Sequence, residues 1–296
     1  MLKQNILTYS AIILAMIFWA YSFIWGKQAL DIYPPSTVVL FRLSIAALIL
    51  FVFAKWTKKL QKIKKSDYKY FFLLAFFEPF LYFVGESQGL KLVSSTFASV
   101  IIATIPLFIA IISFFFLSEK ISIINLIGVF ISIVGVLMIV FTKNMNLSAK
   151  PIGIFFMFLA VFAAVGYTLV IKTLIEKYNI FTIVSWQNII ASIGFIPLFL
   201  FFDFKQFIQI GFSWQALEYI VLLAIFASNG AFILYTYTIK YIGITRAGVF
   251  SNLIPIITAV LAFFILDEKL SLMKYSGIAI VVIGLIITQL QSNKIK

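Results

Sequence analysis

Three ionisable side chains, Arg42, Glu78 and Glu86, lie inside long apolar runs of the sequence. If such a run crosses a membrane, an ionised group in it costs free energy unless it faces protein or water, so these residues usually serve binding or proton transfer. Pro79 follows Glu78 directly and removes a helical hydrogen bond, which leaves the carbonyl group of Ala75 without its usual partner. Together these residues predict a polar site within a membrane-spanning region.

Helical geometry assigns the two carboxylates to different depths. Glu86 lies ~12 Å further along the helix than Glu78 and ~80° around its axis, and Arg42 lies at a similar depth to Glu86 in the preceding apolar run. We expect an ion pair between Arg42 and Glu86, with a structural or gating role; two independent functions are the alternative. Glu78 would then remain unpaired near the middle of its helix. There it would bind an ammonium group or carry a proton, rather than being only a buried neutral acid.

Further candidate binding residues are aromatic or polar and lie well inside the apolar runs. They are Trp19, Tyr21, Ser22, Tyr82, Gln88, Trp186, Gln187, Asn188, Asn229 and Tyr235. Aromatic rings with a few polar groups and an acid suit an amine-bearing, partly apolar solute. Because Phe alone contributes 35 residues, we expect most other aromatic rings to pack or face lipid.

The composition predicts an integral membrane protein. The chain of 296 residues is 63% hydrophobic and 11% charged, and its mean hydropathy is +1.12. It contains neither Cys nor His, which excludes disulfides, thiolate metal ligands, and catalytic triads or zinc sites built on His. No glycine-rich phosphate-binding motif is present, so we expect no cofactor and no enzymatic activity.

Apolar windows of membrane-spanning length predict an all-α protein with ten transmembrane helices. The windows are roughly 7–29, 36–55, 70–90, 95–117, 122–141, 152–172, 181–202, 216–239, 244–266 and 271–290. With the N-terminus inside, about 15 basic residues flank the inner ends and about 7 the outer ends, so both termini are predicted to be cytoplasmic. Seven of the inner lysines lie in residues 55–69. We interpret this run as a topology signal rather than a nucleic-acid-binding arm.

The chain contains an internal repeat. When residues 91–140 are aligned with 240–289 without gaps, about 16 of roughly 50 positions are identical. A weaker match aligns Arg42 with Asn188. We therefore predict two five-helix units, residues 1–143 and 150–296. Because five is odd, the second unit enters the membrane from the opposite side, which is the inverted-repeat plan of many secondary transporters. Duplication without transport is the alternative.

The repeated pattern is similar to that of a known family. It reads Thr96-x-Ala98, Pro106, Glu119-Lys-x-Ser122, Gly128 and Gly135, and it returns as Thr245-x-Ala247, Pro255, Glu268-Lys-x-Ser271, Gly277 and Gly284. This pattern resembles the EamA-type branch of the drug/metabolite transporter superfamily, as does Phe18-Trp19-Ala20-Tyr21-Ser22-Phe23, where Ala20 replaces the family's usual glycine. The resemblance implies a ten-helix carrier with a central cavity that moves small metabolites such as amino acids, often outward.

Prolines and glycines recur at matched positions of the repeat. Pro106 and Pro255 should kink their helices, and with Pro79 they are candidate hinge residues for gating; simple tolerance of proline in membrane helices is the alternative. The glycine pairs of the repeat are seven residues apart, so each pair lies on one helix face and favours close helix packing. We expect Glu119 and Glu268, which precede Ser122 and Ser271 in tight hairpins, to have a structural role at helix starts.

These observations predict a secondary transporter in the cell membrane. We expect it to move amino acids or related amines by alternating access, driven by a substrate or proton gradient. Efflux of cationic drugs or import of a quaternary amine is an alternative, and a membrane-embedded enzyme or assembly factor is the alternative outside transport. The expected partners are the small-molecule substrate, protons, the lipid bilayer and a second copy in a homodimer, but not nucleic acid.

Overall fold

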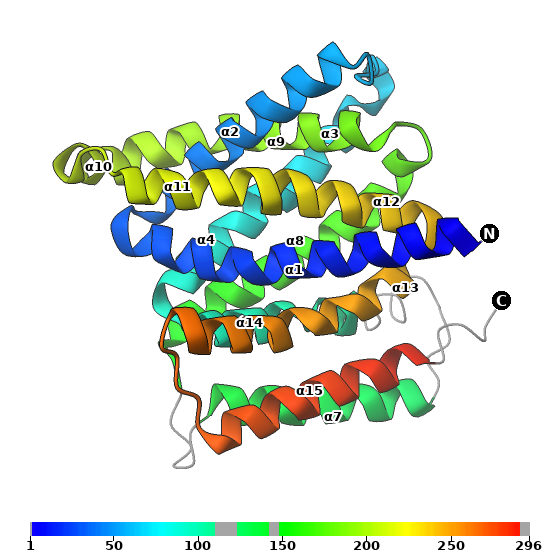
Figure 1. Cartoon of the computed structure of the whole chain (residues 1–296), viewed down its shortest axis with the longest axis vertical. Helices are drawn as coiled ribbons and strands as arrows, with labels where there is room; N and C mark the ends of the chain where they lie inside the picture. The colour runs from blue at the N-terminus through cyan, green and yellow to red at the C-terminus, as the bar shows by residue number, and fades with distance from the viewer. Residues whose placement is uncertain (1, 110–122, 142–147, 291–296) are drawn as a thin grey trace.

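The structure is a computed structural model, and it describes residues 2–109, 123–141 and 148–290. In these ranges the chain forms helices joined by short turns (Figure 1). The helices of the first half are α1 (Leu2–Ile32), α2 (Pro35–Trp56), η1 (Lys65–Asp67), α3 (Tyr68–Ala75), η2 (Phe76–Leu81), α4 (Tyr82–Leu92), α5 (Ser95–Ile102) and α7 (Ile123–Val140). Those of the second half are α8 (Pro151–Ile175), α9 (Ile180–Leu198), η3 (Phe199–Asp203), α10 (Phe204–Ile210), α11 (Trp214–Leu222), η4 (Leu223–Ala231), α12 (Phe232–Ile242), α13 (Ile244–Val249), η5 (Phe250–Asn252), α14 (Leu253–Ile265) and α15 (Leu272–Leu290).

The helices confirm a multi-pass membrane protein. Within the described residues, seven helical stretches are long and apolar enough to cross a membrane, and they coincide with seven of the ten predicted windows. The other three windows correspond to the shorter apolar helices Ser95–Ile109, Ile127–Val140 and Leu272–Ile287. Ten spans and cytoplasmic termini therefore stay predictions. Glu119 and Ser122 lie outside the described residues.

Helices that the repeat makes equivalent run in opposite directions. A Cβ atom placed on Gly135 of α7 would meet the backbone of Gly277 and Val281 in α15, whereas one placed on Gly284 would meet Gly128 and Ser132. Residue numbers thus rise along α7 as they fall along α15, so the two helices are antiparallel, as an inverted repeat requires. The glycines are packing positions, as predicted, and Figure 1 shows the α7–α15 pair at one edge of the bundle.

The same relation holds at α2 and α9, another pair that the repeat makes equivalent. The Oδ2 atom of Asp203, after the end of α9, accepts hydrogen bonds from the backbone N–H (2.8 Å) and hydroxyl (3.3 Å) of Thr37 at the start of α2. Towards the other end of α2, Phe51 packs edge-on against Trp186 near the start of α9. These contacts make α2 and α9 antiparallel neighbours at the boundary between the two halves.

Each half also contains interrupted helices at equivalent positions. The π-helical segment η2 interrupts the third predicted span, and shifting it by the repeat offset gives residues 225–230, which lie within the π-helical segment η4. Pro106 follows a break at residues 103–104, and Pro255 lies in the first turn of α14 after the 3₁₀ segment η5. Each proline therefore follows an interruption of its helix, and the role of these prolines as gating hinges stays a prediction.

Glu268 stabilises a different helix start from the one that the sequence suggested. Its carboxylate does not act on the helix that follows it, where Ser271 Oγ accepts from the backbone N–H of Lys274 (3.4 Å). Instead it reaches the other half and accepts hydrogen bonds from the backbone N–H groups of Ser95 (2.7 Å) and Thr96 (3.2 Å) and from the Thr96 hydroxyl (2.9 Å). Glu268 thus caps the N-terminus of α5 and joins the two halves at one end of the bundle.

The glycine packing gives a first prediction. Gly135→Ala should destabilise the protein by about 1–3 kcal/mol, because the new methyl group would meet backbone atoms 2.6 and 2.8 Å away that cannot rotate aside. Gly248→Ala is the matched control, since its nearest neighbour would lie 3.9 Å away and alanine is the better helix former. Unfolding followed by tryptophan fluorescence in detergent measures both variants. Equal effects of the two substitutions would contradict the packing role.

Glu268 gives a second prediction. Glu268→Ala should lower the free energy of unfolding by about 1–2 kcal/mol, since it removes an ionised cap from two helix N–H groups, and Glu268→Gln should lower it less, because an amide oxygen still accepts. Glu218→Gln, on the exposed face of α11, should leave stability unchanged. The same unfolding assay tests all three, and a Glu268→Ala variant as stable as the Glu218 control would refute the contact.

Candidate functional site

The third predicted span breaks at Glu78. Because Pro79 cannot donate a hydrogen bond, the helix is interrupted there, and Glu78 has the extended backbone angles φ −146° and ψ 121° inside η2. The peptide bond between the two residues is cis. The side chain of Glu78 is buried and, among the described residues, forms no hydrogen bond or ion pair, as the sequence predicts.

Arg42 and Glu86 form the predicted ion pair. Their Nη1 and Oε2 atoms are 3.6 Å apart, and both side chains are more than nine-tenths buried. The Tyr82 hydroxyl donates to Glu86 Oε1 at 3.2 Å, and the Arg42 guanidinium lies 4.1 Å from the centre of the Phe83 ring. At 3.6 Å the pair is a charge contact rather than a close hydrogen bond, so the guanidinium keeps N–H donors for another acceptor.

The second half of the chain completes this site. Arg42 Nε donates to Ser228 Oγ in η4 at 2.7 Å. The neighbouring Asn229 accepts from Asn188 of α9 at 3.1 Å and donates to the carbonyl group of Ala46 in α2 at 3.0 Å. The two repeats therefore meet in a buried polar network that joins α2, α9 and η4.

Aromatic rings lie close to the charged groups. Trp19 of α1 packs against Tyr235 and Phe232 of α12, with ring centres 4.9 and 5.5 Å apart, and Tyr167 of α8 contacts Phe232 at 6.3 Å. The Glu78 charge acts electrostatically on Tyr167, Tyr235 and Arg42. An acid beside several aromatic faces can stabilise an organic cation.

Several buried polar atoms near this network lack a hydrogen-bond partner. Both amide atoms of Gln187 are unpartnered although its side chain is fully buried, and so is Oδ1 of Asn188. The hydroxyls of Tyr167 and Thr236 interact with each other instead. Gln187 lies two turns before Gly194, which faces Phe80 of η2, so Gln187 is on the side of α9 that packs against the broken helix. An unpartnered buried amide is costly, which indicates that a ligand or water completes it.

Other predicted site residues are not joined to the charged cluster by any contact that the structure shows. Tyr21 stacks on Trp25, and the hydroxyl of Ser22 donates to the carbonyl group of Trp19, so these contacts stay within α1. Gln88 forms no hydrogen bond with a described residue. Trp186 packs against Phe51, and its indole N–H is unpartnered. The roles of these four residues in binding stay predictions.

Four residues of the site were missed from the sequence. Ser228 is equivalent to Pro79 in the repeat alignment, so a search for polar partners at repeat-equivalent positions would have found it. Phe83, Tyr167 and Thr236 carry no such signal, because their sequence context does not differ from that of many packing residues. In the described part of the chain, His, Cys, Asp and Glu form no group of three that could bind a metal ion.

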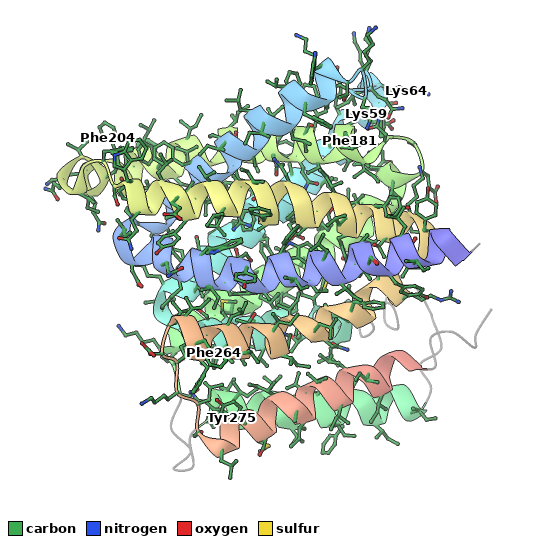
Figure 2. The ribbon with its side chains drawn as sticks, viewed as in Figure 1. Lys59, Lys64, Phe181, Phe204, Phe264 and Tyr275 are labelled. Carbon is green, nitrogen blue, oxygen red and sulfur yellow. The ribbon has the colours of Figure 1, made fainter. Side chains whose placement is uncertain are left out.

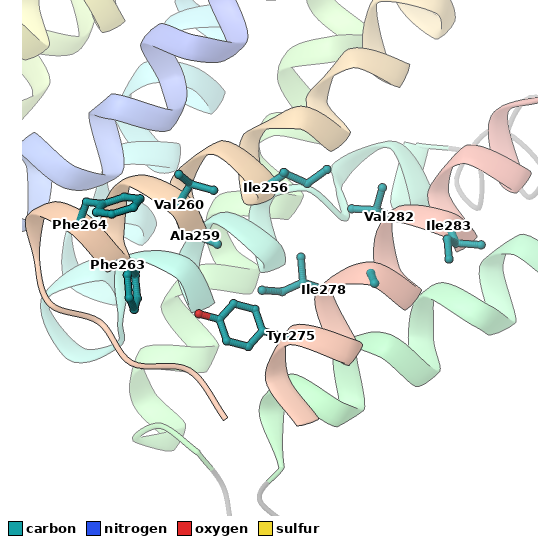
Figure 3. A pocket seen from close by; sticks show the side chains of 10 residues that line it. Ile256, Ala259, Val260, Phe263, Phe264, Tyr275, Ile278, Val282 and Ile283 are labelled. Atoms are coloured by element: carbon teal, nitrogen blue, oxygen red, sulfur yellow. The ribbon is translucent and has the colours of Figure 1, made fainter. Parts of the chain in front are cut away.

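A separate apolar pocket lies away from the charged cluster. It has a volume of about 520 Å³ and opens between α14 and α15 (Figure 3). Its lining contains Phe263, Phe264 and Tyr275 among aliphatic side chains, with no ionisable group other than the Tyr275 hydroxyl. It therefore lacks the polar groups that would orient a metabolite.

Comparisons with known proteins agree with this architecture. The model of the EamA-like transporter family matches residues 6–141 and 151–290, one match in each half. The chain is 29% identical over 274 residues to an uncharacterized transporter of Archaeoglobus fulgidus, which covers 93% of this chain and 95% of that protein. It is 25% identical over 307 residues to the uncharacterized transporter YetK of Bacillus subtilis, covering 99% and 90%.

Two more distant similarities extend the comparison. A chloroplastic WAT1-related protein of Arabidopsis thaliana is 25% identical over 299 residues, covering 96% of this chain and 69% of that protein. A solved crystal structure superimposes with a TM-score of 0.69 at 13% identity and covers 97% of this chain and 98% of the other, which shows a shared fold.

The arrangement of charges predicts that substituting Arg42 lowers the free energy of unfolding more than substituting Glu86. Arg42→Gln should cost about 3–5 kcal/mol of stability, because it leaves two buried carboxylates without a cation. Glu86→Gln should cost clearly less, since Glu78 is within electrostatic reach and balances the remaining Arg42 charge.

The free energy of unfolding in detergent distinguishes these variants, and Glu86→Gln/Glu78→Gln serves as the control that removes both acids. That double variant should be about as unstable as Arg42→Gln, because it leaves the guanidinium unpaired. Equal losses of stability in the two single variants would show that Glu78 does not compensate the charge of Arg42 when Glu86 is neutral.

Proposed function

Because this chain belongs to the EamA-like transporter family, we propose that it is a secondary transporter of amino acids or related amines, working by alternating access. The observation that carries the proposal is the buried cluster of Arg42, Glu78 and Glu86 at the contact between the two repeats. Transporters with inverted repeats place their substrate sites at this interface, beside broken helices.

The charge balance of the cluster supports an amine-bearing substrate. When all three groups are ionised they sum to one negative charge, so a single ammonium group or a single proton neutralises the site. Glu78 is the acid without a partner, and Trp19 and Tyr235 supply aromatic faces nearby. In this proposal an ammonium group and a proton compete for Glu78, which couples substrate movement to a proton gradient.

The spare donors of Arg42 extend the proposal to amino acids. A guanidinium that contacts its carboxylate at 3.6 Å can still donate to a second carboxylate, namely that of the substrate. A zwitterion would then be bound at both ends, by Arg42 and by Glu78. Export across the plasma membrane is the direction we propose.

A second candidate is the transport of larger organic cations, including quaternary amines. The aromatic cluster around Trp19, Phe232 and Tyr167 favours it, because quaternary ammonium groups bind aromatic faces without needing hydrogen bonds. Such a substrate would not need Arg42. An Arg42→Lys variant therefore separates the two candidates: it keeps the charge but removes the bidentate geometry, and it should impair amino-acid transport only.

Glu78→Gln in proteoliposomes tests the proposal. We expect net transport of the substrate to fall at least about tenfold, since the variant loses the unpaired carboxylate that would attract the ammonium group. Substrate exchange without a gradient separates the two roles of Glu78: exchange persists if Glu78 only carries the proton, and it is lost if Glu78 binds the amine. Glu218→Gln, which neutralises an exposed acid on α11, is the control. Unchanged transport with unchanged pH dependence in Glu78→Gln would refute the proposal.

A further inference from the structure

The segment that connects α2 to α3 exposes lysines but no acidic side chain. This segment, the lysine loop, comprises residues 55–69 and carries seven exposed lysines. Its acidic residue, Asp67, does not face solvent. The carboxylate is buried and accepts hydrogen bonds from Lys177 Nζ at 2.9 Å and from the Tyr178 hydroxyl at 2.8 Å. The hydrogen bond to Asp67 raises the pKa of Lys177.

The backbone of the lysine loop is held in place by the turn between α8 and α9. Gln61 donates its backbone N–H to the Thr182 hydroxyl at 2.9 Å, and its side chain accepts from the backbone N–H of Asn179 at 2.6 Å. The backbone N–H of Lys64 donates to the Tyr178 hydroxyl at 3.1 Å. These contacts fix the loop, so its lysines are displayed by an ordered scaffold rather than by a free chain.

Five lysine side chains of the lysine loop make no direct polar contact with the protein. Among the described residues, Lys55, Lys58, Lys62, Lys64 and Lys65 form no hydrogen bond or ion pair. Lys59 differs, because its Nζ atom lies over the Phe181 ring at 4.6 Å. Figure 2 shows Lys59 and Lys64 at the same end of the bundle as the start of α1.

The lysine loop lies where membrane headgroups would be. It connects two helices that are long and apolar enough to cross a membrane, α2 and the stretch from η1 to α4. Trp56 and Tyr68, near the two ends of the loop, are 84% and 57% exposed, and such amphipathic rings favour the membrane–water interface. We therefore expect the exposed ammonium groups to lie at the depth of the lipid phosphates, close enough for electrostatic attraction between the two.

We propose that the lysine loop binds the headgroups of anionic phospholipids in the adjoining leaflet. The exposed lysines and the burial of Asp67 fit an anionic ligand. The exposed rings of Trp56 and Tyr68 favour a lipid over a soluble anion, since a soluble anion would make no use of them. Binding there is separate from the Arg42–Glu86 site, and its test does not depend on transport.

Quenching of Trp56 by brominated lipids tests the inference. The protein is reconstituted in phosphatidylcholine that contains a minor fraction of brominated phosphatidylglycerol or, in parallel, brominated phosphatidylcholine. The Trp56 signal is the difference between the natural protein and Trp56→Phe. We expect roughly fivefold enrichment of phosphatidylglycerol at Trp56.

Two quadruple variants make the test specific. K58Q/K62Q/K64Q/K65Q should abolish the preference, whereas K91Q/K150Q/K205Q/K269Q, which removes the same charge from exposed lysines elsewhere in the chain, should retain it. Equal quenching by the two lipids would overturn the inference, as would equal losses in the two variants. Displacement by inorganic phosphate at constant ionic strength would also overturn it, because the site would then bind soluble anions.

Discussion

The burial of charge in an apolar medium is the constraint on which the site depends. Arg42, Glu78 and Glu86 are all buried, and a membrane provides no water to stabilise them unless the protein admits it. The protein compensates Arg42 from both halves: Glu86 of α4 supplies the opposite charge and Ser228 of η4 accepts a hydrogen bond. Separating the repeats would therefore remove part of this compensation, so the site itself helps to hold the halves together.

The inverted arrangement explains why both halves can reach one site. Because α2 and α9 are antiparallel neighbours, a residue in the middle of α2 lies near the middle of α9 and near the interrupted helices beside them. The ends of the bundle carry different contacts between the halves. Asp203 and Glu268 cap helix starts of the first half at one end, whereas Asp67 binds Lys177 and Tyr178 at the other. Alternating access in such a molecule requires that contacts at one end break while those at the other hold.

Much of this architecture follows from the sequence because it depends on how far each residue lies from the ends of its span and on the spacing of the internal repeat. The Arg42–Glu86 pair was predictable since both residues lie equally far from the ends of their spans, and the break at Glu78 was predictable since Pro79 lacks an N–H group. The rotation of each helix about its axis was not, because a uniformly apolar span has no single hydrophobic face. For this reason Tyr167 and the contact of Glu268 with Ser95 and Thr96 emerged only from the structure.

The repeats are equivalent in backbone but not in chemistry. At the matched interruptions the first half has Glu78-Pro79, whereas the second has Ala227-Ser228. Likewise Arg42 is matched by Asn188, and Glu86 by Tyr235. All the charge of the site therefore comes from the first half, and the second contributes uncharged donors, acceptors and aromatic rings. A symmetric backbone supports exchange between two conformations, whereas the buried charges lie on the side of α2, η2 and α4 and the uncharged polar and aromatic groups on the side of η4 and α12.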